Sequence, residues 1–129
     1  MGRRYLIDSN IIIDYAANKL PGKTLEFVEQ LFLNDFLISV VVKIEVLGFN
    51  EAEEKQATLE AFLNTATSFP LDDAIAVTAI QLRKARKLKL GDAIIAATAL
   101  THNLTLLTRN INDFKPIASL DLLNPWDLP

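Results

Sequence analysis

The 129-residue sequence contains no cysteine and a single histidine, His102. The absence of cysteine excludes disulfides, zinc–thiolate sites, iron–sulfur clusters and a thiol nucleophile. One histidine is too few for a multi-histidine metal site, and its place beside Asn103 is typical of a surface or helix-capping residue. No charge-free run reaches the ~20 residues that span a bilayer, and Asp8 interrupts the N-terminus before a signal-peptide core can form. We therefore expect a soluble, cytoplasmic protein.

The length predicts a single domain over residues 1–129. Half of the residues are hydrophobic and 22% are charged, which excludes a largely disordered chain. The formal net charge of −3 argues against nucleic-acid binding through a generally basic surface. Function must therefore be read from particular residues.

Short apolar segments alternate with helical patterns along the chain. We expect strands at residues 4–8, 36–40, 68–71 and 104–108, with a marginal fifth at 120–123. We expect helices at residues 10–18, 23–34, 51–66, 72–88 and 91–100, with a further helix following the second strand through Phe49. Ser9 is a candidate cap for the first helix, and Ala57, Leu59, Phe62 and Leu63 are expected to face the core. This alternation predicts the α/β class, with a central parallel sheet of four to five strands covered on both faces.

Four acids stand out in this pattern: three lie at the end of a strand or the start of a helix, and the fourth lies within an apolar helix. Asp8 ends the first strand, Asp92 begins the last helix, and Asp113 follows the fourth strand, near the carboxyl edge where such sheets bind ligands. Glu45 lies between Ile44 and Val46, where an ionised carboxylate buried alone is costly, so we expect it to be turned inward for a purpose. Taken singly, each acid has an ordinary alternative as a helix cap, a turn residue or a solvated side chain.

Carboxylates gathered at one edge repel one another unless a cation lies between them. Oxygen ligands suit the hard ions Mg²⁺ and Mn²⁺. Four acids bound to metal leave twelve acids against thirteen Lys and Arg residues, so a metal-loaded chain no longer repels a polyanion.

Four sequence motifs resemble those of PIN-domain nucleases. The resemblance spans residues 4–126, and its motifs are Ile7-Asp8-Ser9-Asn10-Ile11-Ile12-Ile13-Asp14, Ser39 with Glu45-Val46-Leu47-Gly48, Gly91-Asp92-Ala93-Ile94-Ile95-Ala96-Ala97-Thr98-Ala99, and Leu107-Thr108-Arg109-Asn110-Ile111-Asn112-Asp113-Phe114. The compact length and the ending Leu123-Asn124-Pro125-Trp126 look most like VapC-type toxins of toxin–antitoxin pairs.

That resemblance implies a three-layer α/β/α fold and a metal-dependent endoribonuclease using Mg²⁺ or Mn²⁺. It carries Asp8, Glu45, Asp92 and Asp113 over as the acidic quartet that binds metal and catalyses. Asn10 and Thr108 match polar positions beside the quartet, and either Asp113 or Asn110 completes it. The family also implies an RNA substrate, a cognate antitoxin protein and a homodimer.

The expected reaction is phosphodiester hydrolysis by a metal-activated water, with Glu45 or Asp113 orienting the water or accepting its proton. A non-catalytic binding protein of the same fold and a free-standing RNA-processing nuclease remain alternatives. A phospho-receiver domain is not expected, because Asp8 has no adjacent acid.

Basic residues outside the motifs have two interpretations. Arg83, Lys84, Arg86, Lys87 and Lys89 form either a solvated helix face or a patch that contacts an RNA backbone. Lys43 and Arg109 are separate candidates for phosphate contact. The aromatic residues Phe27, Phe32, Phe36, Phe49 and Phe62 are expected in the core.

Overall fold

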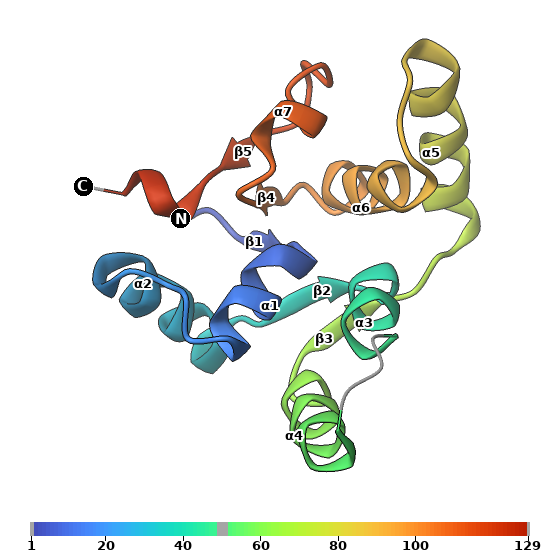
Figure 1. Cartoon of the computed structure of the whole chain (residues 1–129). Coiled ribbons are helices and arrows are strands. Elements are labelled where there is room, and N and C mark those ends of the chain that lie inside the picture. Colours follow the sequence, from blue (N-terminus) through green and yellow to red (C-terminus); the bar gives the residue numbers. More distant parts are fainter. Residues whose placement is uncertain (1, 49–51, 129) are drawn as a thin grey trace.

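The computed structural model describes residues 2–48 and 52–128, so Phe49 lies outside the described residues. Helices and short strands alternate along the chain as expected (Figure 1). In chain order they are β1 (Tyr5–Ile7), α1 (Ser9–Ala16), α2 (Gly22–Asn34), β2 (Leu37–Ser39), α3 (Val40–Leu47), α4 (Glu53–Leu63), β3 (Thr67–Phe69), α5 (Asp73–Ala85), α6 (Leu90–Thr101), β4 (Thr105–Leu107), α7 (Ile111–Phe114), β5 (Leu122–Leu123) and the 3₁₀ helix η1 (Pro125–Asp127).

All strand pairs in the described residues are parallel. β1 pairs with β4, with Ile7 opposite Leu107, and β4 pairs with β5; separately, β2 pairs with β3, with Ser39 opposite Phe69. β1 also lies beside β2, so the strands follow one another as β3, β2, β1, β4 and β5. The predicted five strands are confirmed, but their hydrogen bonds form one three-stranded and one two-stranded ladder instead of one continuous sheet.

The strands differ in burial, and the buried ones have the clearest apolar sequence pattern. β2 and β4 are buried throughout, as are Leu6 and Ile7 of β1, because helices cover both faces of a parallel sheet. β3 is instead an edge strand with Thr67 and Ser68 exposed. α6 contacts β2 and β4, and α5 packs against α6 farther from the strands (Figure 1).

Several local predictions need correction. Asp8, not Ser9, caps α1, because its carboxylate accepts a hydrogen bond from the Ser9 amide and Ser9 is already helical. Ala57, which was expected to face the core, is exposed. Within α4, Leu63 is fully buried, and Leu59 and Phe62 are partly buried against the core. The region after β4, where no helix was predicted, contains the four-residue helix α7.

The aromatic and histidine predictions are largely confirmed. Phe36 is buried, while Phe27, Phe32 and Phe62 are partly buried and packed against the core. His102 is an exposed residue at the C-terminal cap of α6. Its ring stacks on that of Phe69, with 4.2 Å between the ring centroids. Within residues 2–48 and 52–128, no helix is both long and apolar enough to cross a lipid bilayer.

Candidate active site

The Asp8 carboxylate is the buried centre of the candidate site. It follows β1 directly and is only 4% exposed. Oδ1 accepts a hydrogen bond from the Ser9 amide at 2.8 Å, and Oδ2 accepts bonds from Thr108 Oγ1 at 2.8 Å and Asn10 Nδ2 at 3.1 Å. Three donors therefore replace the water that burial removes from this carboxylate.

Thr108 links Asp8 to the segment after β4. This fully buried hydroxyl donates to Asp8 and accepts hydrogen bonds from the Asn110 amide and from Asn10 Nδ2, both at 3.0 Å. Asn10 Oδ1 in turn accepts a bond from the Arg109 amide at 3.1 Å. Because β1 and β4 are paired neighbours, residues 98 to 100 positions apart in the sequence meet at one edge of the sheet.

Asp113 is brought to this edge by α7. Its Oδ2 accepts a hydrogen bond from Asn110 Nδ2 at 2.6 Å, although both residues are exposed. The side-chain amide of Asn110 is thus directed at Asp113.

Glu45 and Asp92 complete the acidic group from α3 and α6. A Cβ built on Gly91 lies 3.8 Å from Glu45 Oε2, so the Glu45 carboxylate lies against the first turn of α6, which contains Asp92. The expectation for Glu45 holds only in part: its carboxylate is turned toward α6, but the residue is exposed, and Ile44 beside it is 64% exposed. α3 buries Val42 and Val46 instead, which leaves Glu45 at the margin of the site.

The pKa values show that the four carboxylates share one electrostatic environment. Burial, only partly opposed by hydrogen bonds from Thr108, Ser9 and Asn10, raises the pKa of Asp8. Burial is also the main cause that raises the pKa values of Glu45 and Asp92. The charge of Asp8 raises both pKa values further. The charge of Asp92 also raises the pKa of Glu45, and the charge of Asp113 also raises the pKa of Asp92. Since exposed charges are screened beyond about 10 Å, these acids lie close together.

The structure therefore brings together all four predicted acids with Asn10, Thr108 and Asn110. In the part of the chain that the structure describes, however, no three acids or histidines already converge as a set of metal ligands. Two hollows described below are lined by other residues, so the acids occupy a different part of the surface.

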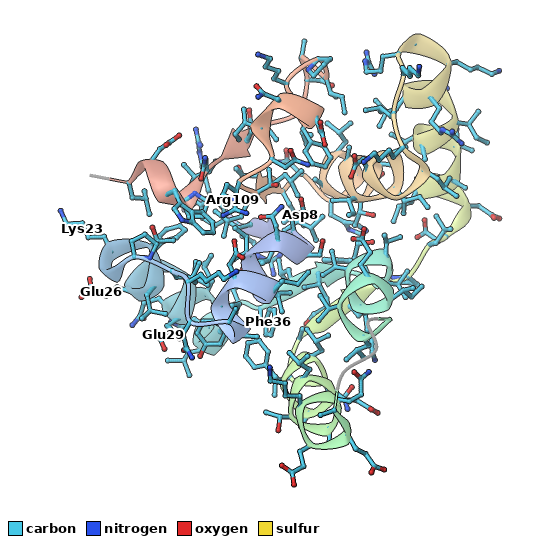
Figure 2. All side chains as sticks on the ribbon, viewed as in Figure 1. Asp8, Lys23, Glu26, Glu29, Phe36 and Arg109 are labelled. Atoms are coloured by element: carbon cyan, nitrogen blue, oxygen red, sulfur yellow. The ribbon has the colours of Figure 1, made fainter. Side chains whose placement is uncertain are left out.

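Arg109 was predicted to be free for phosphate contact, and its side chain is engaged elsewhere. Its Nη1 lies 3.0 Å from Asp14 Oδ2, a buried oxygen to which no described group donates a hydrogen bond. Its guanidinium also lies over the Trp126 ring, 5.0 Å from the centroid. Figure 2 shows Arg109 beside Asp8, where it connects α1 to the C-terminal segment. One feature of the sequence indicates that Asp14 lies near the site: Asp14 is one helical turn after Asn10 and therefore on the same face of the helix.

Lys43 has a local partner, because its Nζ lies 3.4 Å from Asn64 Oδ1. A better-placed cation that the motifs did not single out is Lys89. Its charge lowers the pKa of Asp92, in opposition to the causes that raise it, so Lys89 lies beside the acidic group.

Comparison with known proteins agrees with this arrangement. The PIN domain family model matches residues 5–120, which include all four acids. The chain belongs to the PIN-domain family. This PIN-domain chain is 33% identical over 133 residues to "Ribonuclease VapC2" of Rickettsia felis, a match covering 95% of the chain and 98% of that relative.

Solved structures show the same fold. A "toxin-antitoxin complex from Klebsiella pneumoniae" matches with a TM-score of 0.79 and 30% identity, covering 96% of this chain and 99% of the other. VapBC2 from Rickettsia felis, bound to a DNA fragment from its promoter, matches with a TM-score of 0.77 and 28% identity, covering 93% and 97% respectively. The predicted PIN-like α/β fold is thereby confirmed.

Replacing Thr108 by Val tests the buried network. The substitution keeps the shape but leaves Asp8 Oδ2 and the Asn110 amide each without one hydrogen-bond partner, so we expect a loss of about 1–3 kcal/mol in the free energy of unfolding. Thr98→Val is the matched control, because this buried hydroxyl bonds only to the Ile94 carbonyl within its own helix. Urea denaturation measures both, and equal losses would contradict the role given to Thr108.

Replacing Asp92 by Asn tests the electrostatic repulsion. A pKa that is raised on folding means that ionisation opposes folding, so wild-type stability falls as pH rises from the unfolded-state pKa through the folded-state value. We expect Asp92→Asn to raise Tm by about 2 °C at pH 7 and to lose this advantage near pH 3. Asp73→Asn is the control, because Asp73 also lies in the first turn of a helix. A Tm increase that is equal in both variants, or independent of pH, would refute the repulsion.

Proposed function

We propose that this PIN-domain protein is the ribonuclease toxin of a type II toxin–antitoxin pair and hydrolyses RNA phosphodiester bonds in the cytoplasm. The observation that carries the proposal is the grouping of Asp8, Glu45, Asp92 and Asp113 at one edge of the sheet, where neighbouring acids raise the pKa values of Glu45 and Asp92. The relatives named ribonuclease and the toxin–antitoxin complexes of the same fold support it.

The donor set fits a hard divalent cation such as Mg²⁺ or Mn²⁺. It consists of carboxylate oxygens, and their mutual repulsion is the field that such a cation relieves. Asp8 also keeps room for a ligand bond: a carboxylate offers about four acceptor positions, and three of them are occupied by Ser9, Asn10 and Thr108. Asp8 and Asp92 would hold the ion, with Glu45 and Asp113 contributing directly or through water. When bound, the ion lowers the pKa of water and offsets the charge that develops on the phosphate.

The protein's own residues have distinct parts in this reaction. Thr108 and Asn10 fix the orientation of Asp8, and the Asn110 amide fixes that of Asp113. Glu45 is the better candidate to accept the proton of the attacking water, because burial and the nearby acids raise its pKa, whereas Asp113 is held by Asn110. Its exposure leaves it free to rotate toward the bound phosphate.

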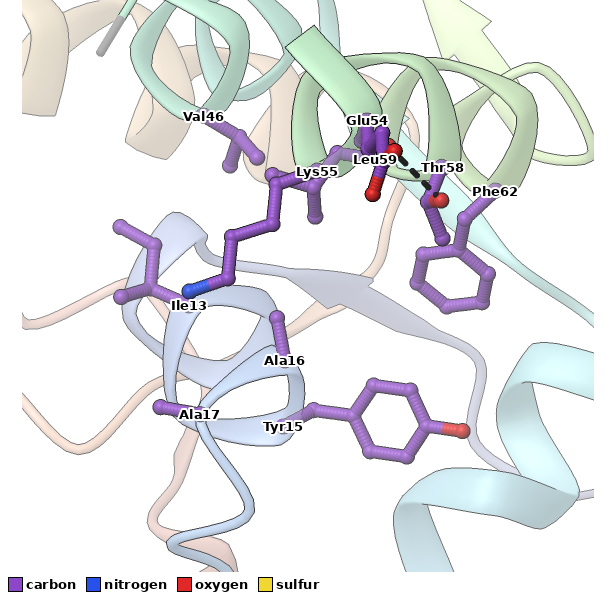
Figure 3. Close-up of a pocket in the computed structure, with 10 residues that line it drawn as sticks. All are labelled: Ile13, Tyr15, Ala16, Ala17, Val46, Glu54, Lys55, Thr58, Leu59 and Phe62. Carbon is purple, nitrogen blue, oxygen red and sulfur yellow. Dashed lines mark hydrogen bonds between the residues drawn. The ribbon is translucent and has the colours of Figure 1, made fainter. Parts of the chain in front are cut away.

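An antitoxin requires a surface that can hold a peptide. A hollow of about 620 Å³ lies between α1, α3 and α4, lined by apolar residues that include Ile13, Val46, Leu59 and Phe62 (Figure 3). Tyr15 and Phe62 also line a second hollow, of about 970 Å³, toward α2. We assign the apolar hollow between α1, α3 and α4 to the antitoxin; the toxin–antitoxin complexes among the structural relatives support the existence of such a partner.

Cleavage of RNA tests the enzyme, and thermal stability tests its metal site separately. We expect the purified chain to cleave RNA with Mg²⁺ or Mn²⁺ and to lose at least about 100-fold in rate with EDTA or as Asp8→Asn. Mn²⁺ at about 100 times its Kd should stabilise the wild type by about 2.7 kcal/mol, and this gain should be much smaller in Asp92→Asn.

Equal cleavage by the wild type, the EDTA-treated protein and Asp8→Asn would mean a contaminating nuclease or a wrong mechanism. Stabilisation by Mn²⁺ without cleavage of any RNA would favour the non-catalytic binding protein. The variant Lys23→Gln, on the exposed face of α2, serves as the control for handling and folding.

A homodimer is proposed through α5. Val77 and Ile80 are each 54% exposed and lie one helical turn apart, which is an apolar face suited to a second copy of the chain. Light scattering should show a dimer for the wild type and a monomer for Val77→Glu. Leu33→Glu, at an 80% exposed position on α2, should remain dimeric. A wild-type monomer at micromolar concentration would contradict the dimer.

A further inference from the structure

The C-terminal end of α5 and the segment leading to α6 are densely basic. Five of the thirteen Lys and Arg residues lie within residues 83–89, and the sequence contains no acid between Asp73 and Asp92. We call Arg83, Lys84, Lys87 and Lys89 the basic ridge. The local sequence therefore offers Arg83, Lys84 and Lys87 no acid within four residues, in a chain whose net charge is −3.

The four side chains of the basic ridge are available to an external anion. All four residues are exposed. Among residues 2–48 and 52–128, the ion pairs formed are those of Arg4 with Asp35 and Arg109 with Asp14, so no acid in this part of the chain forms an ion pair with the ridge. Clustered unpaired cations repel one another, and a bound polyanion relieves that repulsion.

The basic ridge is continuous with the acidic group. Lys89 is the N-cap residue of α6, and Asp92 lies in the first turn of the same helix. Arg86 ends α5 in an extended conformation, and α6 begins at Leu90. The five residue steps from Lys87 to Asp92 span at most about 18 Å even when fully extended. A polyanion bound at the acidic group therefore passes within reach of the ridge.

We propose that the basic ridge binds the sugar–phosphate backbone of RNA next to the bond that is cleaved. This inference rests on the proposed ribonuclease function and adds to it the surface that holds the substrate. Residues 74–91 contain no aromatic side chain on which a base can stack. Lys and Arg contacts to phosphate position a nucleic acid without reading its sequence. The ridge thus supplies affinity and register, while selection of the cleaved sequence depends on other contacts.

Binding to an inactive protein tests the ridge apart from cleavage. The probe is a fluorescein-labelled, random-sequence single-stranded RNA of 30 nucleotides, and anisotropy is measured with Asp8→Asn as the parent. In that background, Arg83→Gln, Lys84→Gln and Lys87→Gln are combined. Each phosphate contact contributes about 0.7 to the slope of log affinity against log salt, so the triple variant should lower the slope by about 2 and weaken binding at least about tenfold at 100 mM salt.

The matched control is the combination of Arg3→Gln, Lys19→Gln and Lys23→Gln. It removes the same net charge from exposed positions outside α5 and α6, and it should change the slope by less than about 0.5. Equal effects of the two triple variants would mean that only net charge matters and would overturn the ridge. Circular dichroism and light scattering check the fold and the oligomeric state; a ridge variant that binds RNA normally but loses the dimer would assign the ridge to a second copy of the chain.

Cleavage distinguishes failure of the ridge from failure of the proposed function. In the active protein with Mn²⁺, the ridge variant should raise KM at least about fivefold on long RNA and leave kcat within about twofold. Unchanged KM and unchanged binding would overturn the ridge while the ribonuclease stands. If the wild type cleaves no RNA, the proposed function fails; a salt slope that still depends on the ridge would then keep the ridge as an RNA-binding surface.

Discussion

The structure of the site depends on one buried carboxylate and the three groups that donate hydrogen bonds to it. Asp8 is removed from water at the end of β1, where an ionised group is stable only when its oxygens are satisfied. Thr108 supplies the bond from the neighbouring strand β4, so the same contact orients the acid and fixes the segment that presents Asn110 and Asp113. Pairing of β1 with β4 is therefore both a fold contact and the basis of the site.

Around Asp8 the folded protein contains electrostatic repulsion between acids, which opposes folding. Burial raises the pKa values of Asp8, Glu45 and Asp92, and neighbouring acids raise those of Glu45 and Asp92 further, which means that the ionised forms are less stable here than in the unfolded chain. Such local destabilisation is typical of functional sites. The cations that would balance it are held apart: Arg109 is committed to Asp14 and Trp126, and the basic ridge begins only at Lys89.

The surfaces proposed for cleavage, for the antitoxin and for RNA binding are formed by largely different sets of residues. The acidic group lies at the ends of β1 and β4 and on α3, α6 and α7, the apolar hollow lies between α1, α3 and α4, and the basic ridge lies at the end of α5. Substrate cleavage, substrate binding and inhibition by a partner are thus separable by substitution. α3 borders both sites, because Val46 lines the hollow and Glu45 belongs to the acidic group.

Local sequence determined most of the elements and the identity of the acids. Apolar strands followed by amphipathic helices are strong local signals. An acid that directly follows a strand is predicted to lie at the carboxyl edge of the sheet. The same signals overestimated the burial of Glu45, whose apolar neighbours suggested an enclosed position although Ile44 and Glu45 are both exposed. They also failed at Arg109, because its partners Asp14 and Trp126 belong to α1 and η1, and no local pattern encodes which distant side chain a cation meets. Tertiary structure alone decided which oxygens of Asp8 are satisfied and where the sheet divides into two ladders, since both depend on how separate segments pack together.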